Sequence, residues 1–175
     1  MRTRLFIFTV SFLIMNISCI SKVISKYDFS TAKCPEKDET IIEKAAVKLV
    51  RDTIAGGYKV IRSDELKSLI DKNPNILMIN TAPNMSCLIP GAKTFVFPIE
   101  KETVLDLKFE KAFIKLLGKT DDLPIIFYCG YTNPGTRSHN AALWAVKLGY
   151  KNVFRNPGGI KAWSERGYPV EILNQ

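Results

Sequence analysis

Short apolar runs alternate with helix-like segments along most of this chain, and that alternation restricts its fold more than any other feature. The runs 75–80 (NILMIN) and 123–129 (LPIIFYC) contain no charged residue, as is typical of strands whose sheet is covered on both faces. Further strands are expected at 58–61, 94–97 and 152–155, and helices at 64–72, 105–117, 137–148 and 160–166. The pattern predicts a three-layer α/β domain with a mostly parallel central sheet and helices on both faces.

An amphipathic helix is expected ahead of this alternation. Apolar residues recur at spacings of three and four from Pro35 to Ile54, and Gly56-Gly57 is a typical helix end. We therefore expect an export signal at 1–21, a linker and this helix at 22–57, and the α/β domain at 58–175.

The N-terminus has the pattern of an export signal. Arg2 and Arg4 precede a mostly apolar run at 5–15. A helix of that length extends about 16 Å, which is too short for a bilayer core of about 30 Å. A cleaved signal fits this pattern better than a spanning or core helix, so we expect an exported protein, either periplasmic or secreted.

Cys19 is a candidate lipidation site. The residues Ile17-Ser18-Cys19 resemble the end of a bacterial lipobox, although Asn16 stands where an aliphatic residue is usual. Cleavage by an ordinary signal peptidase near Ser18 or Ser21 is the competing interpretation. A lipid on Cys19 is the only membrane attachment that we expect.

Charge and cysteine content exclude several functional classes. The net charge is +8, but the basic residues are scattered over predicted helix faces, which is typical of a solvated surface and not of nucleic-acid binding. The chain has 4 cysteines and 1 histidine, with no CxxC pair and no zinc spacing. We expect no disulfide scaffold, no metal site and no cofactor.

Cys129 ends the most apolar strand and precedes the loop GYTNPGT, Arg137 and a helix. Gly130 and Gly135 favour a tight turn whose backbone amides can point inward. The N-terminus of the next helix and the Arg137 guanidinium add positive potential. Such a loop favours a thiolate, a persulfide anion or a bound oxyanion, whereas an inert buried cysteine is the competing interpretation.

The anion- or substrate-binding groups are expected in the same loop. The candidates are Gly130, Tyr131, Thr132, Gly135, Thr136, Arg137 and Ser138.

Several segments resemble the rhodanese superfamily. Residues 123–129 with Arg137-Ser138 are similar to its active-site strand and loop, and 89–92 (IPGA) resembles its mid-domain turn. The segments 148–154 (LGYKNVF), 157–163 (PGGIKAW) and 167–170 (GYPV) closely resemble its closing region. The resemblance covers roughly residues 58–170, and the long loop is similar to that of exported bacterial members.

This resemblance implies a sulfurtransferase. In the family a cysteine carries sulfane sulfur as a persulfide, and that role falls here on Cys129, with anion binding assigned to Arg137. The implied partners are a small sulfur anion such as thiosulfate or polysulfide, or a persulfide donor, and a thiol or protein acceptor.

The chain departs from the family pattern at three places. Seven residues, more than usual, separate Cys129 from Arg137, which shifts the expectation from thiosulfate toward a larger acceptor or a protein partner. Asn80 and Ala82 stand where the family often has Asp and Arg, and Leu88 where it often has His. Less electrostatic support is therefore expected around the cysteine.

Other residues allow two interpretations each. Cys87, beside the mid-domain turn, is either a resolving thiol for oxidised Cys129 or an inert core cysteine. Cys34 in the linker is either a lone thiol or paired with another chain. His139 either tunes the loop or has a surface or capping role. Trp144 and Trp163 are assigned to the core.

Four functions remain to be compared. The leading hypothesis is a sulfurtransferase that works by double displacement. The second is a sulfur-carrier or redox module that does not turn over small donors. The third is a cysteine phosphatase or arsenate reductase, for which the loop is too long and a general acid is missing. The fourth is an interaction domain of the cell envelope that kept only the fold.

Overall fold

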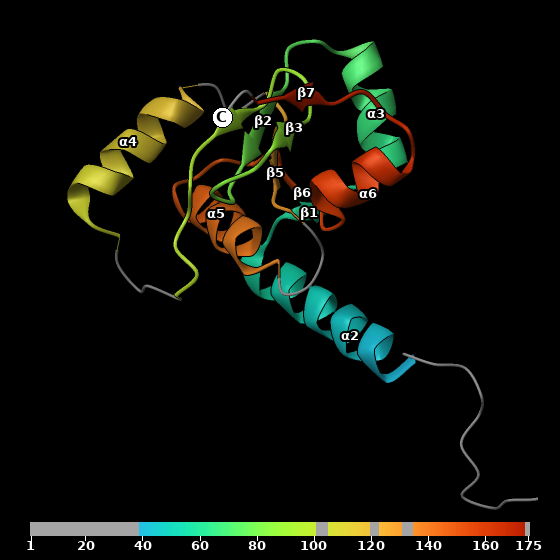
Figure 1. Cartoon of the computed structure of the whole chain (residues 1–175). Helices are drawn as coiled ribbons and strands as arrows, with labels where there is room; N and C mark the ends of the chain where they lie inside the picture. The colour runs from blue at the N-terminus through green and yellow to red at the C-terminus, as the bar shows by residue number, and fades with distance from the viewer. Residues whose placement is uncertain (1–38, 101–104, 120–122, 131–134, 174–175) are drawn as a thin grey trace, which may run out of the picture. The chain divides into compact units, whose positions relative to one another are not determined.

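The computed structural model describes residues 39–100, 105–119, 123–130 and 135–173 (Figure 1). The elements are α2 (Glu39–Gly56), β1 (Lys59–Val60), α3 (Ser63–Lys72), β2 (Leu77–Asn80), β3 (Cys87–Leu88), β4 (Lys93–Thr94), α4 (Leu107–Leu117), β5 (Ile125–Tyr128), α5 (Thr136–Lys147), β6 (Val153–Arg155), α6 (Gly159–Glu165) and β7 (Glu171–Ile172).

Five strands form a central sheet in the order β1-β6-β5-β2-β4, and every pair in it is parallel. The apolar strand β5 lies in the middle. Asn80 of β2 is in register with Tyr128 of β5, and Phe127 of β5 with Arg155 of β6. The carboxyl ends of the three central strands therefore meet at one edge of the sheet, where ligands bind in folds of this kind.

Side chains alternate across the sheet and fill two separate cores. Ile79 and Phe127 pack with residues of α4 and α5, whereas Ile126 and Tyr128 pack with residues of α3 and α6. Figure 1 shows the sheet between these two pairs of helices. The expected three-layer α/β fold with a mostly parallel sheet is confirmed, because both faces of the sheet are covered.

The helix α2 packs on α5, outside the layer that covers the sheet. Its outward side carries exposed apolar residues, among them Val47, Val50 and Ile54. In the part of the chain that the structure describes, no helix combines the length and the apolarity needed to cross a membrane.

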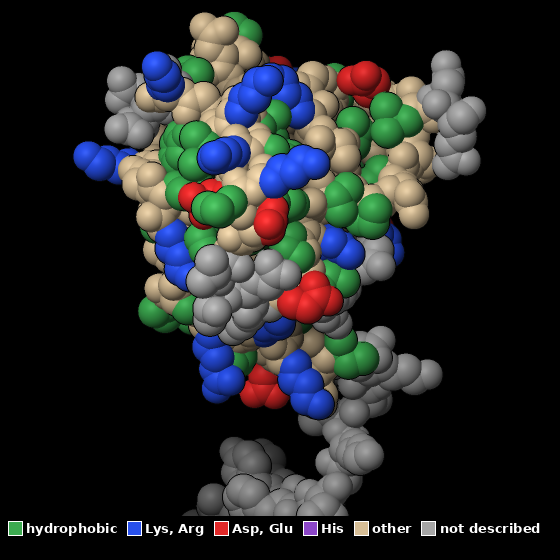
Figure 2. Space-filling view, turned by 90° about the vertical axis from the view of Figure 1, so that its left-hand side faces the viewer, with side chains coloured by type: hydrophobic (Ala, Val, Ile, Leu, Met, Phe, Trp, Pro, Cys, Tyr) green, Lys and Arg blue, Asp and Glu red, His purple; other side chains and the backbone are tan. Residues whose placement is uncertain are grey.

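Basic side chains do not gather into one patch on the face shown in Figure 2, where they are spread among apolar and acidic ones. The helix α4 contributes exposed Lys108, Lys111 and Lys115. On this face the basic side chains are therefore distributed as in a solvated surface.

Some element boundaries differ from the expectation. The strand expected at 94–97 is limited to Lys93–Thr94, and the antiparallel pair β3–β7 was not predicted. Strands of two residues are too short to show an alternation of polar and apolar side chains. The N-cap of α3 is Arg62, and Ser63 is its first residue.

The two tryptophans differ in burial. Trp163 is 2% exposed and belongs to the core, as expected. Trp144 is only partly buried, and the Lys147 ammonium lies 4.7 Å from its ring centroid.

Tyr128 fastens the turn after β3 to the central strand. Its hydroxyl accepts a hydrogen bond of 3.2 Å from the backbone amide of Ile89. Burial raises the pKa of Tyr128, so the phenol stays neutral and can accept this bond without the cost of a buried charge. The turn that follows Ile89 is therefore held against the sheet next to the end of β5.

Candidate functional site

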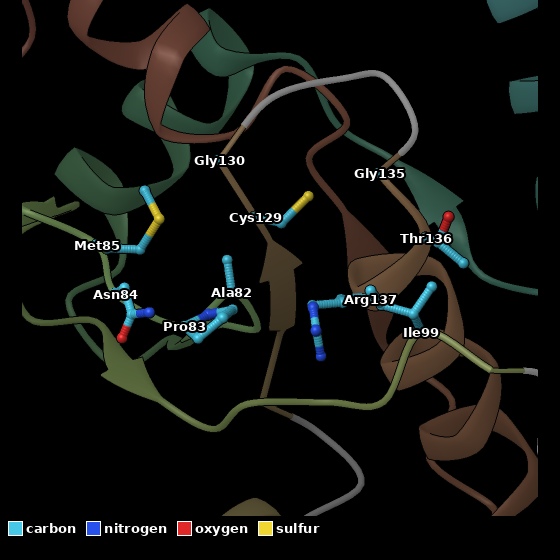
Figure 3. A pocket seen from close by; sticks show the side chains of 10 residues that line it. All are labelled: Ala82, Pro83, Asn84, Met85, Ile99, Cys129, Gly130, Gly135, Thr136 and Arg137. Atoms are coloured by element: carbon cyan, nitrogen blue, oxygen red, sulfur yellow. The ribbon is translucent and has the colours of Figure 1, made fainter.

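A cavity of about 400 Å³ lies at the carboxyl end of β5. Its described lining comes from the loops after β2 and β4, from the end of β5 and from the start of α5 (Figure 3). The lining residues are Ala82, Pro83, Asn84, Met85, Ile99, Cys129, Gly130, Gly135, Thr136 and Arg137. The predicted cysteine is thus part of a cavity wall at the edge of the sheet that favours ligand binding.

Cys129 is 6% exposed, and its sulfur is directed toward the first turn of α5 (Figure 3). The Cys129 Sγ atom lies 3.5 Å from the Ser138 hydroxyl oxygen. The sulfur of this buried cysteine has a polar neighbour and the residue lines a cavity, which favours a reactive over an inert cysteine. The helix N-terminus beside it adds positive potential that favours anionic sulfur.

The cation nearest to this pair in the hydrogen-bond network is Arg155, at the end of β6. Its Nε donates to the Ser138 hydroxyl at 3.2 Å, and its Nη2 donates to the carbonyl oxygen of Gly135 at 2.9 Å. Arg155 is 2% exposed. A buried guanidinium therefore lies directly behind the residue that contacts the sulfur.

The charge of Arg155 is balanced from α2. Its Nη1 lies 3.5 Å from a carboxylate oxygen of Asp52 and 3.2 Å from the Tyr58 hydroxyl. A buried charge is costly unless it is paired and hydrogen-bonded, and Arg155 has both kinds of partner. The helix α2 is thus joined to the site by charge as well as by packing.

His139 belongs to the same network, so of the alternatives offered for it a surface position is wrong. It is 3% exposed, and its Nδ1 lies 2.9 Å from the Tyr58 hydroxyl. Its Nε2 lies 3.9 Å from Asp52. Burial raises the pKa of Tyr58 against the opposing effect of the Arg155 guanidinium, so the phenol keeps its proton near neutral pH.

The Ser138 hydroxyl has one hydrogen and two acceptors within reach. It donates to the Gly135 carbonyl at 3.1 Å, and the Cys129 sulfur is the alternative acceptor. The Gly135 carbonyl also accepts from Arg155, so it keeps a partner when the hydroxyl turns toward the sulfur. Because Arg155 donates to the hydroxyl oxygen, it polarises the O–H group and strengthens this bond to anionic sulfur.

Arg137 has a different position from the one that the sequence suggests. Its Nη1 donates to the carbonyl oxygen of Phe97. In Figure 3 its guanidinium extends away from the sulfur of Cys129, whereas that sulfur is directed toward Gly135. Binding of an anion by Arg137 stays a prediction, but the group that stands behind the sulfur is Arg155.

Sequence analysis did not single out Arg155. The signal available was an arginine that ends a buried strand directly after Val153 and Phe154. Charged side chains are rarely buried without a dedicated partner, so this position indicates a buried polar network. The partners Asp52 and Tyr58 are far away in the sequence and could not be identified from it.

The other predicted site residues have different places. Gly130, Gly135 and Thr136 line the cavity, and Ser138 is fully buried behind it. Tyr131 and Thr132 lie outside the described residues, as do Cys19 and Cys34.

Cys87 lies in β3, is half-buried and packs against the core on the side of α3 and α6. It does not belong to the described lining of the cavity, to which Met85 contributes instead. Its role as a resolving thiol stays a prediction.

Asn80 holds the loop after β2. It stands at the position where the family that the sequence resembles often has Asp. It is fully buried, and its side-chain amide donates to the Ala82 carbonyl at 2.8 Å, while its oxygen accepts from the Ala82 amide at 3.2 Å. A neutral amide can make both bonds, whereas a carboxylate can only accept. Asn80 therefore shapes one wall of the cavity without adding charge.

The start of α6 closes over the end of β5. The amides of Ile160 and Lys161 each donate at 3.0 Å to the carbonyls of Cys129 and Gly130. Gly159 has a positive φ of +59°, and a Cβ atom there would lie 2.0 Å from the Cys129 carbonyl oxygen. Only glycine permits this approach, which fixes the backbone of the cysteine.

Comparisons with known proteins agree with this architecture. A family model described as Rhodanese-like domain matches residues 63–166. The structure of a thiosulfate sulfurtransferase from Pseudomonas aeruginosa superposes with a TM-score of 0.56 at 17% identity over 75% of this chain, which spans 23% of the length of that protein. A full-length protein from Lactobacillus plantarum gives a TM-score of 0.51 at 15% identity, over 75% of this chain and 99% of that one. A homodimeric polysulfide-sulfur transferase from Wolinella succinogenes gives 0.48 at 18% identity, over 80% and 93%.

Replacement of Gly159 by alanine tests the close approach of α6 to Cys129. We expect Gly159→Ala to lower the free energy of unfolding by at least about 2 kcal/mol, because it adds a steric clash to an unfavourable φ. Urea denaturation measures this loss. The matched control is Gly167→Ala, at a φ of +71° with no atom within 4 Å of the added Cβ, which should cost only about 1 kcal/mol. Equal losses in the two variants would contradict the close approach.

Replacement of Ser138 by alanine tests its hydrogen bond to the sulfur. A hydrogen bond to a charged group contributes about 1.5–3 kcal/mol, so Ser138→Ala should slow alkylation of Cys129 by iodoacetamide about tenfold or more. Peptide mass spectrometry follows the reaction at Cys129. Ser68→Ala removes an exposed hydroxyl bonded to the Asp64 carbonyl and should leave the rate unchanged. An unaltered rate in a normally folded Ser138→Ala protein would show that the hydroxyl does not stabilise the thiolate.

Proposed function

The chain belongs to the rhodanese-like domain family, and on that basis we propose that it is a sulfurtransferase in which Cys129 carries sulfane sulfur as a persulfide. One observation carries the proposal. The Cys129 sulfur, in the wall of a cavity, contacts the Ser138 hydroxyl, and that hydroxyl accepts a hydrogen bond from the buried cation of Arg155. The similarity of the fold to a thiosulfate sulfurtransferase supports the same chemistry.

The reaction proceeds in two displacements. The Cys129 thiolate attacks the outer sulfur of a donor, the S–S bond of the donor breaks, and sulfite, a thiolate or a shortened polysulfide leaves. An acceptor thiolate then attacks the outer sulfur of Cys129–S–S⁻, which breaks the new S–S bond and regenerates the Cys129 thiolate. The inner sulfur is anionic before and after the cycle, and the persulfide is anionic between them. The Ser138 hydroxyl, polarised by Arg155, can turn from the Gly135 carbonyl to the sulfur and so can serve as a donor at each stage.

Phosphate ester hydrolysis fits the cavity less well. Departure of an alkoxide requires a general acid, which is usually a carboxylic acid or an imidazole. Neither group occurs among the lining residues that the structure describes. Sulfite and thiolates are stable anions and leave without protonation, so the same lining suits sulfur transfer.

A sulfur-carrier module without efficient turnover is the second candidate. It is favoured by the engagement of Arg137 with the Phe97 carbonyl, since this arginine then does not face the sulfur where thiosulfate would have to bind. A carrier loads one sulfur and keeps it, whereas an enzyme passes it to a thiol repeatedly. Release of sulfite over many cycles from thiosulfate and excess dithiothreitol separates the two.

Intact mass spectrometry tests the persulfide directly. After incubation with thiosulfate or polysulfide, the wild-type protein should gain the mass of one sulfur atom. The gain should be absent in Cys129→Ser and retained in Cys87→Ser, which removes the other cysteine of the described residues. No gain with either donor, or an equal gain in Cys129→Ser, would exclude the proposal.

We also propose that the protein is exported, from the sequence pattern of residues 1–21, which lie outside the described residues. Expression of the full chain in a Gram-negative bacterium, fractionation and intact mass give the site of cleavage. A lipoprotein would begin at Cys19 and carry lipid, and Cys19→Ala would abolish both the lipid and cleavage at this position. Cleavage near Ser18 or Ser21 would give a protein without lipid, and an uncleaved chain in the cytoplasm would contradict export.

A further inference from the structure

We propose that the sulfur acceptor is an organic thiol with an apolar body and a carboxylate, which binds with its sulfur at Cys129 and its carboxylate at Arg137. This inference rests on the proposed function and names the substrate class of the same site. It comes from three properties of the cavity: its size, the chemistry of its walls, and the separation of the two arginines.

The cavity is larger than an inorganic sulfur anion requires. Its volume of about 400 Å³ lies in the usual range of pockets for organic ligands, about 300–1,000 Å³. A small, strongly hydrated anion would contact only part of the walls. An organic molecule can contact the cysteine and the far wall at the same time.

The walls are mostly apolar. Ala82, Pro83 and Met85 form one side, and Ile99, which is 50% exposed, stands on the side of Arg137. An inorganic dianion loses hydration against such walls without regaining hydrogen bonds, whereas an apolar group gains free energy there. Ile99 thus adds apolar surface at the cavity that an apolar group of a ligand could bury.

The two arginines serve different ends of the cavity. Arg155 is buried and acts on the sulfur through Ser138. Arg137 lines the cavity itself, and its guanidinium extends away from the sulfur in Figure 3. A cation in the wall that does not face the reacting sulfur fits a second, distant anionic group of the ligand.

The orientation of Arg137 is fixed by the protein. The bond to the Phe97 carbonyl takes one of the five N–H donors of a guanidinium and sets its direction. Asp106 lines the neighbouring hollow with Arg137, and its Oδ1 accepts from the amides of Lys108 and Phe109 at the start of α4. No acidic residue is found in the described lining of the cavity. A carboxylate is the ligand group that a fixed guanidinium matches best, because it accepts two parallel hydrogen bonds.

Transfer to such a thiol is balanced without any further reactant. The acceptor thiolate attacks the outer sulfur of the Cys129 persulfide, and the S–S bond to Cys129 breaks. The products are the Cys129 thiolate and the persulfide of the acceptor, so that sulfane sulfur is neither oxidised nor reduced.

The test is a single-turnover experiment with four related thiols. The full-length protein is loaded with polysulfide, freed of excess donor and mixed with 2-benzyl-3-mercaptopropionate, which has both groups. 3-Phenylpropane-1-thiol lacks only the carboxylate, 3-mercaptopropionate lacks only the benzyl group, and ethanethiol lacks both. Intact mass follows the loss of sulfur, and each rate is divided by the rate of the same thiol with a small disulfide in solution.

The thiol with both groups should remove sulfur about tenfold faster than either thiol with one, since a charge-assisted hydrogen bond contributes about that factor or more. Arg137→Gln should abolish the benefit of the carboxylate and keep that of the benzyl group. Ile99→Asn should do the reverse. Arg166→Gln, which changes an exposed arginine at the end of α6, should preserve both benefits.

The outcomes separate this inference from the proposed function. A protein that takes up no sulfur overturns both. A protein that loads sulfur but transfers it to all four thiols at equal normalised rates overturns only the inference. The same holds if Arg137→Gln slows the four thiols by one common factor, because Arg137 would then act on the sulfur and not on a distant carboxylate.

Discussion

The buried guanidinium of Arg155 is the interaction on which the architecture of the site depends. It joins β6 to α2 through Asp52, to the segment before β1 through Tyr58, and to the start of α5 through Ser138 and Gly135. A charge that is 2% exposed needs all of these partners, because desolvation would otherwise outweigh the attraction to any single one. The requirement to satisfy one cation thus fixes the positions of elements that are distant in the sequence. The Arg155 cation acts on the Cys129 sulfur through the Ser138 hydroxyl and does not contact the sulfur directly.

Strand register explains why these residues meet. Cys129 follows directly on β5, and Arg155 ends the neighbouring strand β6, in register with Phe127. Parallel strands bring their carboxyl ends to one edge, so Cys129 after one strand and Arg155 of the next strand lie close together. Gly159, at the start of α6, packs closely against the backbone of Cys129. The chemistry of the site is therefore a consequence of sheet topology as much as of the loop that follows the cysteine.

The sequence predicted those features that repeat or cluster locally. The uncharged run 123–129 identified β5 and placed Cys129 at its end, and the alternation of strands and helices indicated the three-layer fold. Local patterns could not show that the Arg137 guanidinium would bond to the carbonyl of Phe97, because that contact depends on how the loop after β4 passes α5. For the same reason the role of His139 stayed open between tuning the loop and a surface or capping role, although the side chain is buried beside Tyr58 and Asp52. The pair β3–β7 was missed because two residues per strand carry no periodicity.

Asp52, which pairs with Arg155, lies in α2, ahead of the residues that match the family. The family match starts at residue 63, whereas the counter-ion of Arg155 comes from α2, ahead of the first strand. A protein shortened to the family boundaries would keep four strands of the central sheet, the cysteine and the described cavity walls, but it would lose β1, Tyr58 and Asp52. The buried charge of Arg155 would then lack its carboxylate partner. The N-terminal helix α2 therefore supplies a charge partner to the site. It is an integral part of the electrostatics of the domain, and exchanging it for another linker would alter the sulfur centre from a distance.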